Sequence, residues 1–469
     1  MKKILSNVVY QSLFQIVKII IPLITIPIVS KALGPENVGI FKYSNSIVSY
    51  FALIAGMGTT LYGQRQIAMH RSSKQKMSEV FWSIEMLSVF VSILIFIIYF
   101  LVCLILNWNL IYIIQSLTII AVMFDISWLF MGLEDFKLPS IRSTIVSLTS
   151  LMLIIFFVNS KDDLYVYVFI TVVSTLLSQL CMWPFLKNRV KFVKISLKMV
   201  FNHFKGTIEL FFPTIAITFY TNLNITVLGF FSTSENVAFY SNAILFTTII
   251  TSLISTLDTV MLPQISFRLT KESKESILET LKITLNLPFY FTIPAYFGLC
   301  LISPKMIPWF LGDNFKFVIY LIPITSLLII IKPIGMGISR QYLISSGRIK
   351  EYSRSLLYGA IVGLILNVIL VPIFDIWGSV FTIITAETII VISRLVPFIK
   401  ETSFKYNIKF IFIYFLCSIF MYVITFFMTF NLSESILTTA IQIMLALGIY
   451  LFLTIIMKVS PINSLLKKK

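Results

Sequence analysis

The stretch ENVGIF, at Glu36–Phe41, decides the fold, because the chain repeats it as ENVAFY at Glu235–Tyr240. Each copy follows a hydrophobic segment, and the match needs no gap. The offset between the copies is 199 residues, from position 36 to position 235. Similarity at a fixed distance indicates that the chain holds two related structural units.

The composition places both units in a lipid bilayer. Hydrophobic residues make up 58% of the chain and charged residues 12%, and the mean hydropathy is +0.95. Soluble domains have about a quarter of their residues charged. Internal repeats in a membrane protein are typical of transporters.

Apolar runs long enough to cross a hydrocarbon core of about 30 Å occur fourteen times. A backbone in lipid has to satisfy its own hydrogen bonds, so we expect each run to be a helix and the fold to be all-α. The predicted spans are 8–30, 38–63, 81–106, 110–133, 140–158, 164–186, 206–231, 237–263, 283–303, 316–345, 355–372, 377–398, 408–430 and 436–457.

Basic residues predict the orientation. Most of the 37 Lys and Arg residues fall in alternate loops and at both ends of the chain. Cytoplasmic loops carry such an excess, so we expect both termini to be cytoplasmic. We therefore expect the dense basic segment Lys187–Lys205 to be a cytoplasmic linker that lies against anionic lipid headgroups, rather than a nucleic-acid site. Five basic residues fall on the opposite side: Lys31, Lys42, Lys161, Lys305 and Lys316.

The first span carries a polar stripe at helical spacing. Its members are Asn7, Gln11, Gln15, Lys18, Pro22 and Thr25. Lys18 lies about ten residues into the span, roughly 15 Å deep. An ammonium there costs at least about 2.5–3.5 kcal/mol. It should therefore face a water-filled cavity, or else form a structural ion pair, for example with Asp125.

The related helix in the second half keeps the stripe without the charge. At the same offset, Thr214, Thr221 and Asn224 correspond to Gln15, Pro22 and Thr25, whereas Lys18 corresponds to Ile217. Two related helices lining one cleft would explain the pattern. Alternatively, each threonine bonds only to its own helix backbone.

A second cation at mid-depth is Lys332, about fifteen residues into the tenth predicted span. Pro333, Gly335 and Gly337 follow it and are expected to break the helix, which would free backbone groups near the charge. Arg340 comes about two turns later. With Lys18, these cations form a candidate track for an anion.

Carboxylates also occur at depth. Asp125, Asp258 and Glu387 lie within predicted spans, and Glu85 and Glu209 lie nearer the inner boundary. Buried carboxylates can bind H⁺ or Na⁺ in a coupled cycle, or serve as fixed counter-ions for the lysines. Both roles are open. The sequence shows no catalytic, cofactor or metal motif, so we expect no enzyme, cofactor or metal site.

The opening stretch from Asn7 contains Pro22 and Pro27, then Ser30-Lys31, Leu33-Gly34-Pro35 and Gly39, and ends at Gly63 and Arg65. With this pattern it resembles the start of Wzx-type oligosaccharide flippases, which belong to the multidrug/oligosaccharidyl-lipid/polysaccharide (MOP) exporter superfamily. Further echoes are WLFMGLEDFK at Trp128–Lys137 and YLISSGRIKEY at Tyr342–Tyr352.

The resemblance implies a MATE-like fold of two six-helix lobes and two C-terminal helices around a central cavity. The lobes would be 1–190 and 206–400, joined by a basic linker at 191–205 and followed by helices 13 and 14 with a basic tail at 401–469. The protein would reside in the bacterial plasma membrane and work by alternating access.

The implied cargo is an undecaprenyl-diphosphate-linked oligosaccharide for capsule, O-antigen or exopolysaccharide synthesis. A polysaccharide polymerase and chain-length machinery are candidate partners. Lys18, Lys332 and Arg340 would attract the diphosphate. Polar residues that would line the cavity and bind sugars are Gln11, Gln15, Asn45, Thr214, Thr221 and Asn224.

Three alternatives stay open at this stage. A cation-coupled multidrug exporter or a lipid II flippase of the same superfamily would share the architecture. A membrane glycan polymerase or ligase belongs to another class, and would be expected to carry a large outer loop with catalytic residues. Every predicted outer loop is short.

Overall fold

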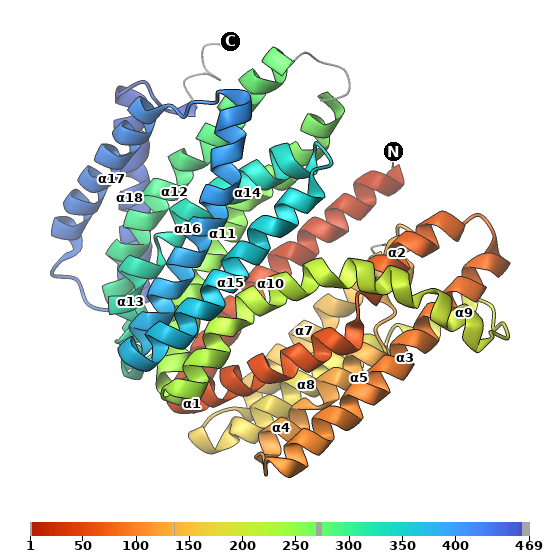
Figure 1. The fold of residues 1–469 in the computed structure, drawn as a ribbon. Coiled ribbons are helices and arrows are strands. Elements are labelled where there is room, and N and C mark those ends of the chain that lie inside the picture. Colours follow the sequence, from red (N-terminus) through yellow and green to blue (C-terminus); the bar gives the residue numbers. More distant parts are fainter. Residues whose placement is uncertain (1, 136, 269–273, 462–469) are drawn as a thin grey trace. The chain divides into compact units, whose positions relative to one another are not determined.

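The computed structural model describes residues 2–135, 137–268 and 274–461. Within these ranges it describes no side chains at 2–19, 188, 212–213, 216–217, 220, 256–268, 274–275 and 277. The chain forms two compact units, Met1–Thr226 and Val227–Lys469, traced in Figure 1. The lobe and linker boundaries predicted from the sequence stay a prediction.

Unit 1 contains helices joined by loops, and no strand occurs in its described part. Short 3₁₀ turns, at Lys161–Asp163 and Trp183–Asn188, flank α8. The helices are α1 (Lys2–Gly56), α2 (Thr59–His70), α3 (Lys74–Ile105), α4 (Leu110–Gln115), α5 (Leu117–Met123), α6 (Ser127–Gly132), α7 (Lys137–Phe157), α8 (Leu164–Leu180), α9 (Leu197–Asn202) and α10 (Phe204–Phe231), whose last residues enter unit 2.

Unit 2 is also helical in its described part. A 3₁₀ turn at Asp313–Phe315 precedes α13, and a π-helix, η4 (Ser339–Ile344), follows α14. The helices are α11 (Ser234–Arg268), α12 (Lys274–Phe310), α13 (Val318–Thr325), α14 (Leu328–Ile338), α15 (Ile349–Phe374), α16 (Ile376–Thr402), α17 (Ile408–Thr429) and α18 (Ile436–Ile456).

The described part contains twelve helical segments that are long and apolar enough to cross a membrane. The first of them, Ile20–His70, contains the second part of the predicted span 8–30 and the whole of the predicted span 38–63. The predicted span 206–231 coincides with α10, where several side chains are not described. The all-α membrane fold is thus confirmed, whereas the count of fourteen spans stays a prediction.

Both copies of the repeated stretch lie at the start of a helical segment. In unit 1, Gly34 interrupts α1 with φ 74° and ψ 172°, just before Pro35 and the first copy. Glycine tolerates this positive φ, and proline suits the first turn of the segment that follows. In unit 2, the second copy begins one residue after α11 starts at Ser234. The matching residues Val38 and Val237 are both buried.

Two predicted single helices are interrupted. The span 110–133 is split into α4, α5 and α6, with breaks at Ser116 and at 124–126. The span 316–345 is split into α13, α14 and η4. The expected break after Lys332 is wrong: α14 continues through Pro333 to Ile338. Proline there removes one backbone hydrogen bond, and packing of this helix outweighs that loss.

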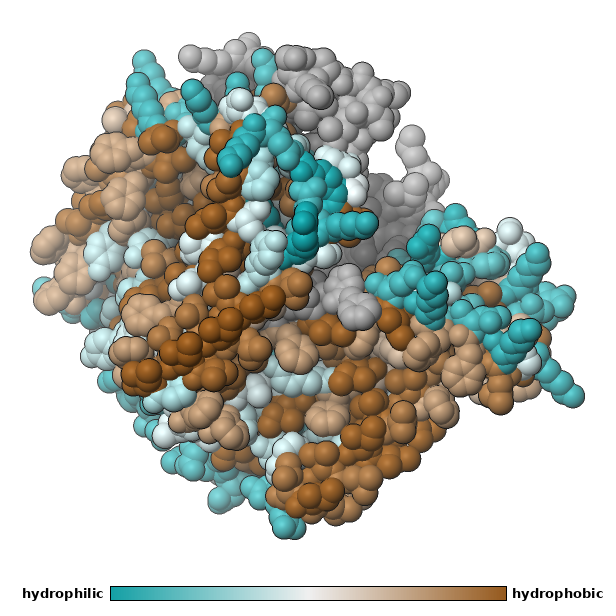
Figure 2. Space-filling view, viewed as in Figure 1, coloured by the Kyte–Doolittle hydropathy of each residue, from teal (hydrophilic) through white to brown (hydrophobic). Residues whose placement is uncertain are grey.

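Close packing of α2 on α6 fixes part of the unit 1 core. A methyl group at Gly63 would lie 2.4 Å from the Trp128 ring, and one at Gly132 would lie 2.7 Å from Ile67. Trp128 is almost fully buried beside Phe81, with ring centroids 5.2 Å apart. Figure 2 shows hydrophobic side chains along the flank of α3 and hydrophilic ones around α9.

Candidate functional site

Four predicted site residues lie outside the described side chains. Gln11, Gln15 and Lys18 fall on the first part of α1, and Asp258 falls on α11. Their predicted roles therefore stay predictions.

The second predicted cation, Lys332, has a carboxylate partner. Its Nζ lies 3.1 Å from Oε1 of Glu387, and this ion pair joins α14 to α16. The Lys332 side chain is 22% exposed and that of Glu387 is 10% exposed. Of the two roles that the sequence left open for Glu387, this geometry favours the counter-ion.

Arg340 lies on the π-helix η4, two turns beyond Lys332. Its Nη1 donates to the backbone carbonyl of Ser255 on α11, at 3.0 Å. Short π-helical turns inside α-helices are frequent at functional sites. The side chain is half-buried, so part of its surface is accessible.

A buried cation that the sequence analysis did not single out is Arg394 on α16. It is 6% exposed. Its Nε donates to Ser355 Oγ at 2.8 Å, and its Nη1 donates to the carbonyl of Gly335 at 3.0 Å. The guanidinium also lies 5.2 Å from the ring centroid of Tyr352. An arginine inside the apolar run 377–398 was the signal that could have revealed it.

In unit 1, the predicted carboxylate Asp125 lies between α5 and α6. Its Oδ1 accepts a hydrogen bond from the Ser127 amide at 2.9 Å, which stabilises the start of α6. Glu85 on α3 is 2% exposed, and neither of its carboxyl oxygens has a hydrogen-bond partner in the described part of the chain. The sequence placed Glu85 near the inner boundary of the membrane and did not predict its burial in the protein.

The predicted sugar-binding residues have different environments. Asn45 is exposed. Thr214 and Thr221 donate to the carbonyls of Leu210 and Thr218 in their own helix, at 3.3 and 3.1 Å. This is the local bonding that the sequence had offered as the alternative. Asn224 is 3% exposed. Their role in binding sugars stays a prediction.

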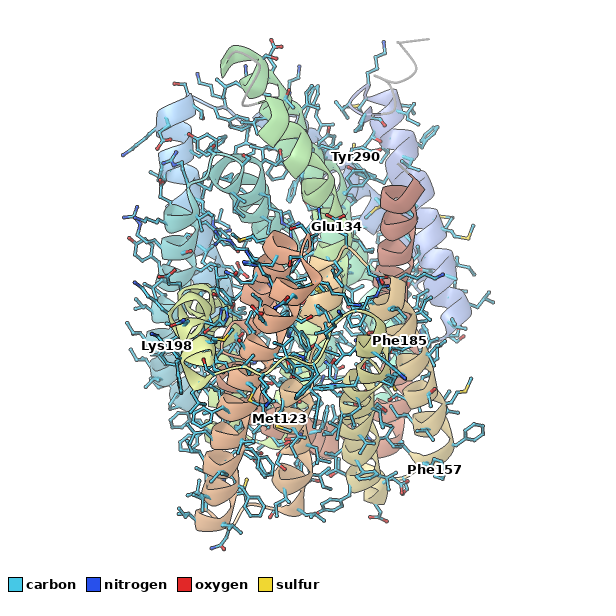
Figure 3. All side chains as sticks on the ribbon, turned by 90° about the vertical axis from the view of Figure 1, so that its right-hand side faces the viewer. Met123, Glu134, Phe157, Phe185, Lys198 and Tyr290 are labelled. Carbon is cyan, nitrogen blue, oxygen red and sulfur yellow. The ribbon has the colours of Figure 1, made fainter. Side chains whose placement is uncertain are left out.

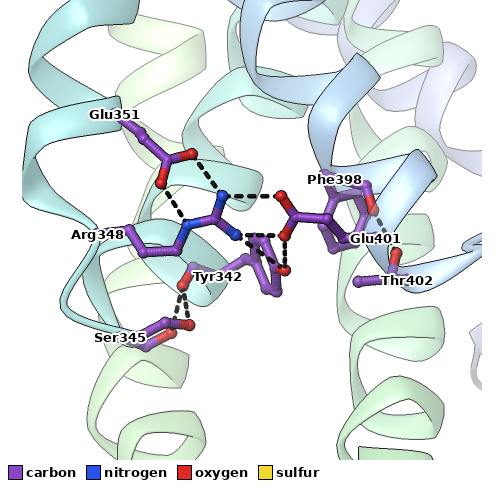
Figure 4. Close-up of polar contacts among 8 residues, drawn as sticks. Tyr342, Ser345, Arg348, Glu351, Phe398, Glu401 and Thr402 are labelled. Carbon is purple, nitrogen blue, oxygen red and sulfur yellow. Dashed lines mark hydrogen bonds and ion pairs between the residues drawn. The ribbon is translucent and has the colours of Figure 1, made fainter.

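A dense ionic cluster follows η4 in unit 2 (Figure 4). Arg348 donates to both oxygens of Glu351, at 2.6 and 2.5 Å, and to both oxygens of Glu401. The Tyr342 hydroxyl donates to Glu401 at 2.6 Å. Hydrogen bonds to these two carboxylates raise the pKa of Arg348. The cluster ties the segment after η4 to the end of α16.

The two sequence echoes outside the opening stretch thus have structural roles. The second echo, Tyr342–Tyr352, forms most of the Arg348 cluster. In the first, Glu134 pairs with Arg71 at 2.6 Å and Asp135 pairs with Arg189 at 2.7 Å.

Comparison with known families now adds to this geometry. The family model described as "Polysaccharide biosynthesis protein" matches residues 4–267, which is more than half of the chain. The chain belongs to this polysaccharide biosynthesis family. Membership confirms the resemblance seen in the opening stretch. A "Putative O-antigen transporter" of Escherichia coli (strain K12) is 24% identical over 406 residues, covering 85% of this chain and 97% of that protein.

Solved structures give the fold of this family member. The inward closed conformation of the lipid II flippase MurJ matches with a TM-score of 0.77 at 17% identity, over 95% of this chain and 98% of that one. An inward-facing multidrug resistance MATE transporter of the MOP superfamily matches with a TM-score of 0.61 at 14% identity, over 85% and 98%. The fold is therefore MATE-like.

Proposed function

We propose that this member of the polysaccharide biosynthesis family is a flippase. It moves an undecaprenyl-diphosphate-linked oligosaccharide repeat unit from the inner to the outer leaflet of a bacterial plasma membrane, by alternating access and with both termini cytoplasmic. The relative named for O-antigen transport supports this cargo, because the match spans 97% of that protein.

The observation that carries the proposal is the Lys332–Glu387 pair. A lysine inside the apolar stretch Val318–Ile344 is costly, and such residues mark substrate or ion pathways. Lys332 keeps 22% of its side chain exposed while paired. We propose that a cargo phosphate replaces Glu387 as its partner. Arg340 would then bind the same anionic group. In unit 1, we propose that Lys18 also binds the cargo diphosphate.

Glu387 has a defined task in this scheme. It neutralises Lys332 when no phosphate is bound, which limits the cost of an unpaired charge in the membrane. Asp125 and Asp258 remain the candidates for coupling to H⁺ or Na⁺. If they couple, transport in vesicles will respond to an imposed gradient of either ion, and Asp258→Asn will lose that response. An unchanged response in both Asp125→Asn and Asp258→Asn removes them from the mechanism.

The test of the function is complementation in a strain that lacks this flippase. Lys332→Ala should abolish surface polymer and cause the lipid-linked repeat unit to accumulate, with near-normal protein in the membrane. Lys350→Ala, which removes an exposed lysine in the first turn of α15, is the matched control and should export normally. Normal export by Lys332→Ala, Arg340→Ala and Lys18→Ala would refute the diphosphate assignment.

The same assay separates the proposed cargo from lipid II. We expect the wild-type protein to restore surface polymer but not to rescue cells depleted of their lipid II flippase. Rescue of those cells without restored polymer would replace the proposed function with lipid II transport.

A further inference from the structure

A groove in unit 2 has no residue of α14 or α16 among its described lining residues. It occupies about 1000 Å³ where α12 begins, α17 begins and α18 ends. Three lysines line it: Lys282 on α12, Lys405 before α17, and Lys458 after α18. We call it the lysine groove. Its volume is at the upper end of the range for small-molecule sites.

The charge of the lysine groove is uncompensated in the described part of the chain. All three lysines are exposed, and none of their ammonium groups has an ion pair or a hydrogen bond to a described residue. Among the described residues that line the groove there is no Asp or Glu. Three like charges around one concavity repel each other, so an anion in the groove would be stabilised by all of them.

A second feature is an apolar wall that continues from the lysines. Phe410, Ile411 and Ile455 line the groove, and Phe410 and Ile455 are 38% and 43% exposed. These residues belong to α17 and α18, which are apolar enough to cross a membrane. The groove therefore offers cationic groups at one end of the membrane-spanning helices and hydrocarbon contacts along them.

Hydrogen bonds hold the end of α18 in place beside the groove. The Tyr414 hydroxyl donates to the Val459 carbonyl at 3.1 Å, and the Tyr450 hydroxyl donates to the carbonyl of Tyr290 at 2.8 Å. Tyr290, labelled in Figure 3, also lies 3.3 Å from the Ser460 hydroxyl. All three tyrosines are buried. These hydrogen bonds fix α18, Val459 and Ser460, which border the groove.

We propose that the lysine groove binds an anionic phospholipid. The phosphate lies among the three lysines, and an acyl chain follows Phe410, Ile411 and Ile455. Basic pockets between membrane helices on the cytoplasmic side suit such headgroups. One phosphate then bridges α12, the segment before α17 and the segment after α18.

The experiment is lipid retention by the full-length protein in native mass spectrometry, with phosphatidylglycerol and phosphatidylcholine compared at equal concentration. Wild type should retain one phosphatidylglycerol in preference. Each lysine is expected to raise the affinity for phosphatidylglycerol by about a factor of five, so removal of all three should lower it about a hundredfold. The test variant is Lys282→Ala/Lys405→Ala/Lys458→Ala, and the matched control is Lys191→Ala/Lys198→Ala/Lys350→Ala, which removes three exposed lysines elsewhere.

Two further variants separate charge from shape. Replacing the three lysines by arginine keeps the charge and should keep the preference for phosphatidylglycerol. Ile411→Trp fills the groove without changing charge and should lower retention. The unfolding midpoint without added lipid reports whether each variant is folded.

Three results would overturn the proposal. Equal retention of both phospholipids by wild type would show ordinary lipid contact only. An equal loss in the control variant would show a general surface effect. Stronger retention of undecaprenyl phosphate than of phosphatidylglycerol would assign the groove to polyprenyl carriers instead.

Discussion

The Lys332–Glu387 pair allows the structural and the transport role of one charge to be separated. We predict that the double variant Lys332→Met/Glu387→Gln is stable but does not export. Each single variant leaves one charged group in a site that is mostly shielded from water. The double variant removes both charges, so it avoids that cost while losing the cation that the cargo needs.

The magnitude follows from the geometry. At 3.1 Å, two unit charges in an effective dielectric of about 20 attract by about 5 kcal/mol, before desolvation is subtracted. Exposed pairs retain about 0.2–1 kcal/mol, and breaking a fully buried pair costs about 3–5 kcal/mol. With side chains 22% and 10% exposed, the pair lies between these limits, and we expect a coupling free energy of about 2 kcal/mol.

The assay is a double-mutant cycle on the free energy of unfolding in detergent, with export measured on the same four proteins. The control cycle uses Arg71 and Glu134, which are only 2.6 Å apart but 48% and 54% exposed. Its coupling energy should stay below about 1 kcal/mol. A Lys332–Glu387 coupling no larger than the control would refute the shielding argument. Normal export by the double variant would refute the role of Lys332 in transport.

Three other substitutions test the packing and charge of the fold. Gly63→Ala would place a methyl group 2.4 Å from Trp128 and should lower the free energy of unfolding by about 1–3 kcal/mol, whereas Gly298→Ala, with nothing within 4 Å, should not. Arg394→Lys should cost about 2 kcal/mol in the same measurement, because a lysine cannot replace the fixed fork of donors. Burial lowers the pKa of His203 in the folded protein. Its contribution to stability is therefore complete above the pKa of the unfolded state, about 6.5, and is lost as the pH falls through the lower pKa of the folded state. Between pH 7 and pH 5, wild type should lose more stability than His203→Gln.

Much of the fold could be predicted because it depends on local composition. Apolar runs located most of the membrane helices, because hydropathy is a property of each segment by itself. The breaks at Ser116 and near Asp125 could not be predicted, since a side chain that bonds to the backbone in the middle of an apolar run leaves no signal in hydropathy. The π-helix at Ser339–Ile344 likewise depends on contacts with other helices, such as the one between Arg340 and α11.

The candidate site was predictable only as separate charges. The depth of Lys332 follows from its position in an apolar run, but its pairing with Glu387 depends on how α14 packs on α16. Arg394 could have been found from its position inside an apolar run, but its acceptors, Ser355 and Gly335, could not, because they lie far away in the sequence. A charge inside an apolar run is therefore a reliable signal of a partner, although the sequence does not identify that partner.

The packing of α14 on α16 separates two kinds of buried cation. Glu387 and Arg394 lie seven residues apart on α16, which places them on one face about 10 Å apart. Arg394 is 6% exposed and donates to a backbone carbonyl and a serine hydroxyl, so releasing it would leave several buried groups unsatisfied. Lys332 pairs with a carboxylate and is more exposed. When a phosphate replaces that carboxylate, Lys332 still has an anionic partner. Lys332 can therefore change partners during transport at a lower free-energy cost than Arg394.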